Sequence, residues 1–285
     1  MPKLTDHKIF VLKGTVLSQQ AFQGEYRHLV IRAPQIARQA EPGQFVMIQP
    51  GRGTEPLLPR PFSIYRAAHA HPESIEILYK VIGMGSALMS DKQPGDDLQV
   101  IGPLGHPFAI KKTGAPMWLV GGGYGVGPMV FITDVLRSQK SEVRIQKSGF
   151  IRAFIGARTK NAVLCVNEFK KNKVLVHVST NDGSMGMKGL VTDVIERELK
   201  KTGARPTFYA CGPTPMLRAV AELAMRYGLP SEVSLEETMG CGTGVCLSCV
   251  CDVHSENGGS SQRMICRHGP VFAGDQVQWD KLRKH

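Results

Sequence analysis

The chain has 285 residues, 42% of them hydrophobic and 21% charged, which is ordinary for a globular protein and enough for two domains plus a small module. Its formal net charge of +11 suits an anionic cofactor, an acidic protein partner or nucleic acid. Nucleic-acid binding is not expected, because the sequence has no zinc-finger or RNA-recognition signature. The most apolar window, 117–132, is interrupted by five glycines and Pro128, so no membrane span is expected. Met1 to Asp6 lack the features of a signal peptide, which predicts a reducing, cytoplasmic location.

The first part of the chain, residues 1–112, is predicted to form an antiparallel β-barrel. Short runs rich in β-branched and aromatic residues alternate with Gly and Pro pairs such as Pro42-Gly43 and Pro94-Gly95. These runs are residues 9–17, 26–31, 44–48, 74–81 and 97–101. A further strand is expected to begin at Arg60, and about six strands at this spacing favour a closed barrel.

Two segments of the predicted barrel carry signals for a cofactor with a diphosphate. In Arg60-Pro61-Phe62-Ser63, the arginine can bind a diphosphate with two hydrogen bonds, and the serine can hydrogen-bond to N5 of an isoalloxazine ring. Alone, this pattern also fits an ordinary strand that begins with a surface arginine. Leu78-Tyr79-Lys80 leads into Gly83-Met84-Gly85-Ser86, where a glycine turn and a helix starting at Ser86 predict an anion site.

Residues 113–230 are predicted to form a doubly wound α/β domain, because strands and helices alternate there. The predicted strands are residues 117–120, 152–155, 174–178 and 207–210. Helical spacing of apolar residues occurs in 189–200, just before Gly203, and again after Thr214, which can cap a helix with Pro215 in its first turn.

Three loops of this domain follow predicted strands, at the edge where open α/β sheets bind ligands. The first is a glycine loop that allows a dinucleotide pyrophosphate to approach the backbone, and it contains Gly121, Gly122, Gly123, Gly125 and Gly127. The second contains Asp182 within Asn181-Asp182-Gly183, which a plain turn explains equally well. The third is Cys211-Gly212-Pro213. Arg158, after the second strand, does not decide between NAD and NADP.

The C-terminal part, residues 231–285, is marked by its cysteines. Cys241, Cys246 and Cys249 have C-x4-C-x2-C spacing, and Cys266 follows, which is the plant-type ligand pattern of a [2Fe–2S] cluster. Neighbouring glycines let the backbone N–H groups fold closely around an inorganic core. A zinc site or a disulfide framework is the alternative, but the sequence has one C-x2-C knuckle where structural zinc sites usually pair two. Cys251 is interpreted as a bystander.

Taken in order, these motifs resemble those of the ferredoxin–NADP reductase superfamily and, more closely, of the electron-transfer subunits of class 1B dihydroorotate dehydrogenases. The resemblance covers essentially the whole chain and extends to the closing sequence from Cys266 to Phe272. It implies that the barrel holds FAD through Arg60, Pro61, Phe62, Ser63, Leu78, Tyr79, Lys80, Gly85 and Ser86. It further implies NAD(H) at the glycine loop, Asp182, Gly212 and Pro213, with Ser63 and Cys211 lining the face of hydride transfer. The implied cluster ligands are Cys241, Cys246, Cys249 and Cys266.

The resemblance also implies a hetero-oligomer, expected to be a heterotetramer, that serves pyrimidine biosynthesis. A separate FMN-containing catalytic subunit oxidises dihydroorotate to orotate, and this chain passes the electrons to NAD+. The chain itself carries no base constellation for dihydroorotate, so it is not expected to oxidise this substrate alone.

Three other functions stay open at this point. One is the small subunit of a bifurcating NADH-dependent ferredoxin–NADP oxidoreductase, in which an aspartate stands in place of Cys241. The second is the reductase component of an oxygenase. The third is a nucleotide-sensing module without redox function, against which the complete set of cysteines argues.

Overall fold

The computed structural model describes residues 8–51, 56–69, 71–110, 114–138, 150–255 and 258–282. The expected boundary at 112/113 and the residues examined for a signal peptide lie outside these ranges. The chain forms two compact units: unit 1 comprises Met1–Pro107, Glu237–Val250 and Arg263–Pro270, and unit 2 comprises Phe108–Glu236, Cys251–Gln262 and Val271–His285. Residues 231–285 therefore contribute to both units, and the predicted three-domain division stays a prediction.

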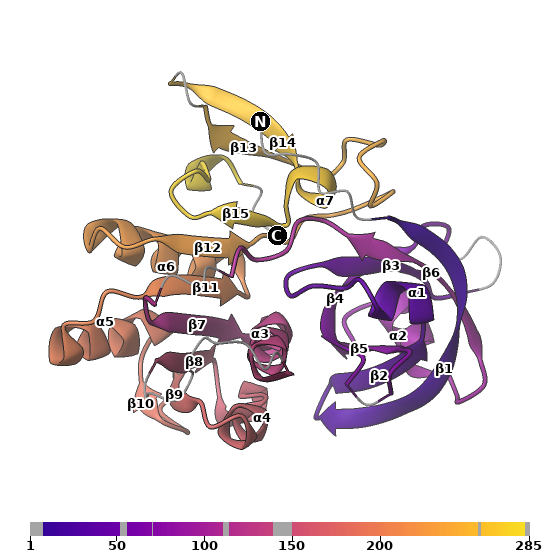
Figure 1. Ribbon diagram of the computed structural model, residues 1–285, viewed down its shortest axis with the longest axis horizontal. Coiled ribbons are helices and arrows are strands. Elements are labelled where there is room, and N and C mark those ends of the chain that lie inside the picture. Colours follow the sequence, from indigo (N-terminus) through magenta and orange to yellow (C-terminus); the bar gives the residue numbers. More distant parts are fainter. Residues whose placement is uncertain are drawn as a thin grey trace. The chain divides into compact units, whose positions relative to one another are not determined.

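Unit 1 contains a closed antiparallel barrel with the strand order β1-β2-β5-β4-β3-β6 (Figure 1), which confirms the predicted architecture. The strands are β1 (Phe10–Gln23), β2 (Tyr26–Arg32), β3 (Phe45–Gln49), β4 (Arg60–Ala67), β5 (Ser74–Lys80) and β6 (Asp97–Leu104). Two short helices, α1 (Pro34–Ala37) and α2 (Met84–Ser90), connect them. Strand β1 extends beyond its predicted end at Leu17, because two β-bulges let its second half continue to pair with β2.

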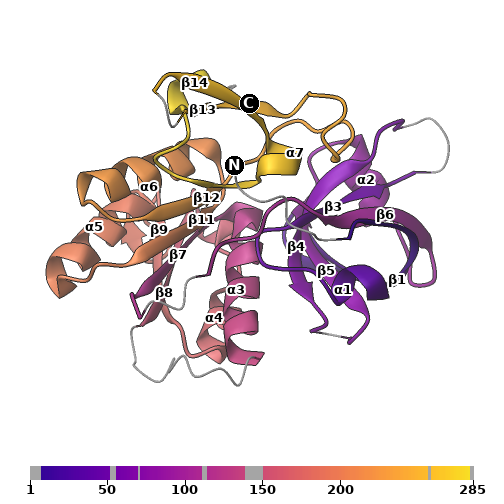
Figure 2. The same cartoon turned by 45° about the horizontal axis from the view of Figure 1, so that its top comes forward.

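Unit 2 contains a seven-stranded sheet with the order β10-β9-β8-β7-β11-β12-β15. Its first strands are β7 (Met117–Gly122), β8 (Ile151–Ala157), β9 (Leu175–Thr180), β10 (Met187–Lys188) and β11 (Thr207–Cys211). Helices α3 (Val126–Ser138) and α4 (Val166–Lys171) lie on one face, and α5 (Val191–Thr202) and α6 (Thr214–Arg226) lie on the other (Figure 2). This confirms the doubly wound domain. Among the described residues, no helix combines the length and the apolar character that crossing a membrane requires.

Two strands of this sheet come from the part of the chain after residue 230, which the sequence pattern did not predict. β12 (Ser231–Ser234) pairs in parallel with β11, and β15 (Val271–Ala273) pairs antiparallel with β12. Strands of four and three residues are too short to show an alternating pattern. The remaining elements, β13 (Val250–His254), β14 (Ser260–Met264) and α7 (Ile265–His268), complete the C-terminal region, where β13 and β14 form a two-stranded sheet.

A nearly buried ion pair links the sheet of unit 2 to α5. Arg152 on β8 pairs with Glu198 on α5, and their side chains are 15% and 11% exposed. The Arg152 guanidinium also lies 5.6 Å from the centroid of the Trp118 ring. His177 Nε2 is 4.0 Å from the same carboxylate. Burial lowers the pKa of His177, so its imidazole is neutral near pH 7 and does not replace the arginine charge.

We expect Arg152→Met to lower the free energy of unfolding by about 3 kcal/mol, because the largely buried Glu198 carboxylate then keeps only the exposed Lys201 ammonium, 3.9 Å away, and the neutral His177 as neighbours. The double variant Arg152→Met/Glu198→Leu removes both charges and should recover most of that loss. Urea unfolding followed by tryptophan fluorescence measures both. A double variant no more stable than the single one would show that the pair does not act through charge compensation.

Candidate functional site

The four predicted cluster ligands all lie in unit 1 and form two interacting pairs. Cys241 and Cys246 lie on the loop that follows residue 239, whereas Cys249 and Cys266 are only 2% and 3% exposed. The backbone N–H of Cys246 donates to Sγ of Cys241, and the backbone N–H of Cys266 donates to Sγ of Cys249, both at 3.4 Å. Among the described residues, no three His, Cys, Asp or Glu side chains gather as the ligands of one metal ion. Two thiol pairs match the two irons of a [2Fe–2S] cluster.

The loop that carries Cys241 and Cys246 is called the cluster loop here. Its backbone amides point at Cys241. Its Sγ accepts hydrogen bonds from the N–H groups of Val245 at 3.3 Å and of Thr243 and Cys246 at 3.4 Å. Burial raises the pKa of the Cys241 thiol, but these donors outweigh burial and bring the pKa down to about 6. Iron is bound by thiolates, so this loop favours the form that a ligand needs.

The other thiols differ in their surroundings. Hydrogen bonds from Ser248 lower the pKa of the exposed Cys246 thiol. Burial raises the pKa of Cys266 to about 12, and its backbone N–H donates to Sγ of Cys249 at 3.4 Å. One pair is therefore near solvent and rich in donors, and the other is enclosed. The donor set and the amide cradle fit an iron–sulfur cluster.

The two predicted flavin segments meet at the start of β4. The side chain of Arg60 lies across Gly85, where an added Cβ would stand 3.1 Å from Cγ and 3.2 Å from Nε of the arginine. The missing side chain of Gly85 thus lets a guanidinium lie against the first turn of α2. An arginine beside the backbone amides of a helix's first turn suits a diphosphate, and this arrangement fits the pyrophosphate of FAD.

Helix α2 begins at Met84, two residues before the predicted start at Ser86. The Ser86 hydroxyl accepts hydrogen bonds from the N–H groups of Ile82 and Gly83 at 2.9 and 3.0 Å and donates to the Gly83 carbonyl. The predicted start was wrong because Ser86 caps the turn from inside the helix. Since its hydroxyl is used in the turn, a phosphate there would meet backbone amides and Arg60.

The remaining flavin candidates line neighbouring strands. Phe62 and Tyr79 pack edge to face with ring centroids 5.5 Å apart. Burial raises the pKa of Tyr79 to about 12, and its hydroxyl lies 2.7 Å from Nε2 of Gln19. Lys80 pairs with Glu25 at 2.9 Å, and Ser63 is the register partner of Phe45. These positions share one region of β4 and β5, and their contacts with FAD stay a prediction.

In unit 2 the structure brings together two loops that the sequence presented separately. A Cβ on Gly125 would lie 2.7 Å from the carbonyl carbon and oxygen of Cys211 and from Cα of Gly212. A Cβ on Gly122 would lie 2.9 Å from Cδ of Pro213. The glycine loop therefore packs directly against Cys211-Gly212-Pro213, backbone against backbone, at the carboxyl ends of β7 and β11.

Sequence reasoning missed Tyr124 and Glu236 beside this loop. The Tyr124 hydroxyl donates to the Glu236 carboxylate at 3.0 Å. Burial, together with the smaller effect of the negative charge of Glu236, raises the pKa of Cys211 to about 12. Cys211 is thus a neutral thiol suited to contact with a nicotinamide ring and unsuited to nucleophilic attack. No local motif marks Glu236, because its position depends on β12.

Asp182 lies at the adjoining strand ends. Hydrogen bonds from Ser184 lower the pKa of the Asp182 carboxyl, and the Ser184 hydroxyl donates to its Oδ1 at 2.6 Å. The backbone N–H of Lys160 donates to the same serine at 2.8 Å, which ties the ends of β8 and β9 together. The aspartate is ionised and partly used in its turn, so its contact with a ribose stays a prediction.

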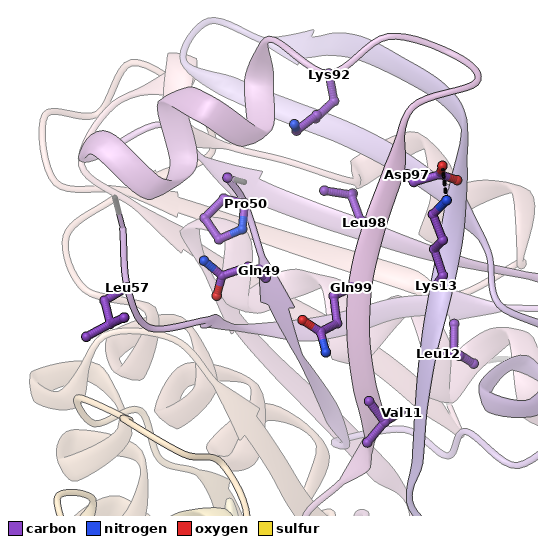
Figure 3. Close-up of a pocket in the computed structure, with 11 residues that line it drawn as sticks. Val11, Leu12, Lys13, Gln49, Pro50, Leu57, Lys92, Asp97, Leu98 and Gln99 are labelled. Atoms are coloured by element: carbon purple, nitrogen blue, oxygen red, sulfur yellow. Dashed lines mark ion pairs between the residues drawn. The ribbon is translucent and has the colours of Figure 1, made fainter. Parts of the chain in front are cut away.

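A cavity of about 890 Å³ lies on the outside of the barrel, between β1, β3 and β6. Figure 3 shows Lys13 and Asp97 pointing toward each other there, with an ion-pair distance of 2.6 Å. None of its described lining residues belongs to a predicted cofactor segment. The cavity is therefore separate from the candidate site.

Comparison with known proteins identifies the family. Residues 236–278 match the iron–sulfur cluster binding domain of dihydroorotate dehydrogenase B, and residues 119–222 match the oxidoreductase NAD-binding domain. The chain is 37% identical over 249 residues to the dihydroorotate dehydrogenase B (NAD(+)) electron transfer subunit of Desulforamulus reducens, covering 87% of this chain and 90% of the relative. This chain belongs to that family. The same subunit of Geobacillus thermodenitrificans is 38% identical over 265 residues, covering 92% and 96%. Membership decides for an iron–sulfur cluster over zinc.

Solved structures place this electron-transfer subunit family among reductases. The NADH-dependent reduced ferredoxin–NADP oxidoreductase, studied for flavin-based electron bifurcation, matches with a TM-score of 0.79 and 29% identity over 94% of this chain and 90% of that one. A ferredoxin reductase of carbazole 1,9a-dioxygenase shares the fold, with a TM-score of 0.63 and 21% identity over 79% and 68%. The resemblance to the ferredoxin–NADP reductase superfamily is confirmed.

We expect Gly125→Ala to abolish NADH oxidation while the visible spectra of flavin and cluster persist. The added methyl group would collide with the backbone of Cys211 and Gly212, which has no flexible side chain to move aside. Gly114→Ala is a control, because nothing lies within 4 Å of its Cβ position, although its positive φ adds local strain. NADH titration of flavin absorbance measures the effect, and normal flavin reduction in Gly125→Ala would contradict it.

Proposed function

We propose that this chain is the electron-transfer subunit of a dihydroorotate dehydrogenase B, passing electrons between a partner's FMN and NAD+. The observation that carries this proposal is the arrangement of the four cysteines as two pairs, one of which lies in the amide-lined loop. It is accompanied by a family match that covers most of the chain. When bound, FAD exchanges a hydride with NAD(H) and single electrons with the [2Fe–2S] cluster, so it stands between two-electron and one-electron chemistry.

The residues divide this work between the two units. Arg60 and the amides at Gly85 bind the diphosphate of FAD, and Ser63 faces the reactive edge of the flavin. In unit 2, the glycine loop and Cys211 hold the nicotinamide nucleotide, with the thiol kept neutral by burial. Asp182 contacts its ribose. Cys241, Cys246, Cys249 and Cys266 hold the cluster.

The partner is an FMN-containing dihydroorotate dehydrogenase catalytic subunit, and the assembly is a hetero-oligomer. Electrons enter or leave at Cys246, which is the exposed ligand. Val245 and Leu247 on either side of it are 79% and 61% exposed, and Leu247 has a positive φ of 60°. Large apolar side chains held outward around a redox ligand support a protein contact that excludes water there.

A cytoplasmic location belongs to this proposal, supported by seven cysteines that are all free thiols. The bifurcating and oxygenase-linked alternatives have less support. The bifurcating relative is 29% identical, against 37% and 38% for the two dihydroorotate dehydrogenase B subunits.

The purified chain, reconstituted with FAD and cluster, should oxidise NADH with an artificial acceptor but show no dihydroorotate turnover. The reason is that it supplies the nicotinamide site and lacks the dihydroorotate site. Adding the FMN catalytic subunit should restore dihydroorotate-dependent NAD+ reduction. Dihydroorotate turnover by the chain alone, or an oxygenase recovered as its native partner, would refute the proposal.

Cys246→Ser should abolish electron passage to the partner while NADH still reduces the flavin, because the flavin and nicotinamide sites do not contain this thiol. Cys251→Ser is the matched control, since Cys251 is buried and outside the ligand set. EPR of the reduced protein reports the cluster, and flavin absorbance reports hydride transfer. Equal damage from Cys251→Ser would show that Cys251 is no bystander.

A further inference from the structure

Three buried side chains on the barrel form an apolar platform under the cluster loop. Phe45 and Met47 of β3 and Leu104 of β6 are 3%, 0% and 2% exposed. Phe45 and Leu104 are register partners on neighbouring strands, and Met47 lies two residues from Phe45 on β3, with a register shift against β6 between them. A Cβ on Gly242 would meet both Met47 and Leu104, so these two side chains reach the same face. We refer to these three residues as the platform.

The cluster loop rests on the platform at Gly242. A Cβ on this glycine would collide with Cγ of Met47 and would stand 2.9 Å from its Sδ and 3.2 Å from Cδ1 of Leu104. Gly242 also has a φ of +71°, which glycine adopts readily. The backbone next to the ligand Cys241 is therefore in direct van der Waals contact with β3 and β6.

The segment after the last ligand is anchored beside the platform, on the residues that follow β6. The backbone N–H of His106 donates to the Gly269 carbonyl at 2.6 Å, and His106 forms a β-bridge with Pro270. A Cβ on Gly105 would collide with Pro270 and would stand 3.0 Å from Cε1 of Phe45. Figures 1 and 2 both show α7, which precedes this segment, beside the β3 end of the barrel.

Strand β3, which carries Phe45 and Met47, also pairs with β4, which begins with the predicted flavin motif. Met47 pairs with Pro61, and Phe45 pairs with Ser63. Directly paired residues of an antiparallel ladder point to the same face, with Cβ atoms about 5 Å apart. Met47, which supports the cluster loop, and Phe45, which lies beside Gly105, are thus one strand away from Pro61 and Ser63, the second and fourth residues of the flavin motif.

We infer that Met47 and Phe45 are positioning residues that set the distance between the cluster and the flavin. This inference rests on the proposed function. Each NADH that is oxidised supplies two electrons to the flavin, which would pass one to the cluster and keep the other until the partner or an artificial acceptor has reoxidised the cluster. Electron tunnelling slows steeply with distance. Close packing of Gly242 on Met47 resists drift of the loop and would therefore keep this transfer fast.

The test compares Met47→Ala and Met47→Leu in the anaerobic holo-chain. Rapid mixing with NADH gives the rate of flavin reduction by absorbance and the rate of cluster reduction by freeze-quench EPR. Met47→Ala should slow cluster reduction about tenfold or more, because the loop loses its support, and leave flavin reduction within about twofold. Met47→Leu conserves side-chain volume and should restore the wild-type rate.

Hydrogen exchange provides a readout that does not depend on turnover. Amides of residues 242–246 should exchange at least about tenfold faster in Met47→Ala, because a cavity replaces their support. Ile36→Ala is the control, since Ile36 on α1 is a fully buried aliphatic residue of the same unit outside the platform. It should leave exchange in the loop and cluster reduction unchanged.

Cluster reduction at the wild-type rate in Met47→Ala, with wild-type iron content, would overturn the inference. If Met47→Ala loses its cluster, Met47→Val is the deciding variant. Cluster reduction at the wild-type rate in that variant would also overturn the inference. If NADH cannot reduce the cluster of the unmodified chain, that result would instead refute the proposed function.

Discussion

The cluster loop depends on backbone that approaches other backbone and side chains more closely than any Cβ would permit. Gly242 lies on Met47 and Leu104, and the amides of Thr243, Val245 and Cys246 turn toward one sulfur. The same turn therefore supplies the donors that stabilise a thiolate and the contact that ties the loop to the barrel. Any substituent that lifts the loop would disturb ligand chemistry and ligand position together.

This constraint explains why the cluster ligands belong to the barrel unit. Glu237–Val250 and Arg263–Pro270 pack with β1 to β6, whereas β12, which precedes the first segment, and β15, which follows the second, complete the sheet of unit 2. The C-terminal part of the chain serves both units. The electron-carrying loop is thus held by the element that pairs with the flavin motif, while its flanking segments are held by the nicotinamide domain's sheet.

The nicotinamide site uses the same physical device for a different purpose. Gly125 and Gly122 let one loop lie against Cys211-Gly212-Pro213, so two strand ends form one continuous surface. Burial and the Glu236 charge keep the Cys211 thiol protonated, which suits the soft, uncharged contact with a nicotinamide ring that we propose for it. The excess of positive charge in the chain is consistent with anionic nucleotides at both units.

The sequence alone determined the barrel, the doubly wound domain and the four cysteines, because these depend on local patterns. Alternating apolar residues, strand-ending glycines and C-x4-C-x2-C spacing can each be read within a few residues. Only the tertiary structure decided that Ser86 caps α2 from within, that β12 and β15 extend the sheet, and that Glu236 lies beside Cys211. It also decided which strand supports the cluster loop. The contact of Gly242 with Met47 joins residues 195 positions apart in the numbering, and no local spacing records such a contact, because close packing selects it from both partners at once.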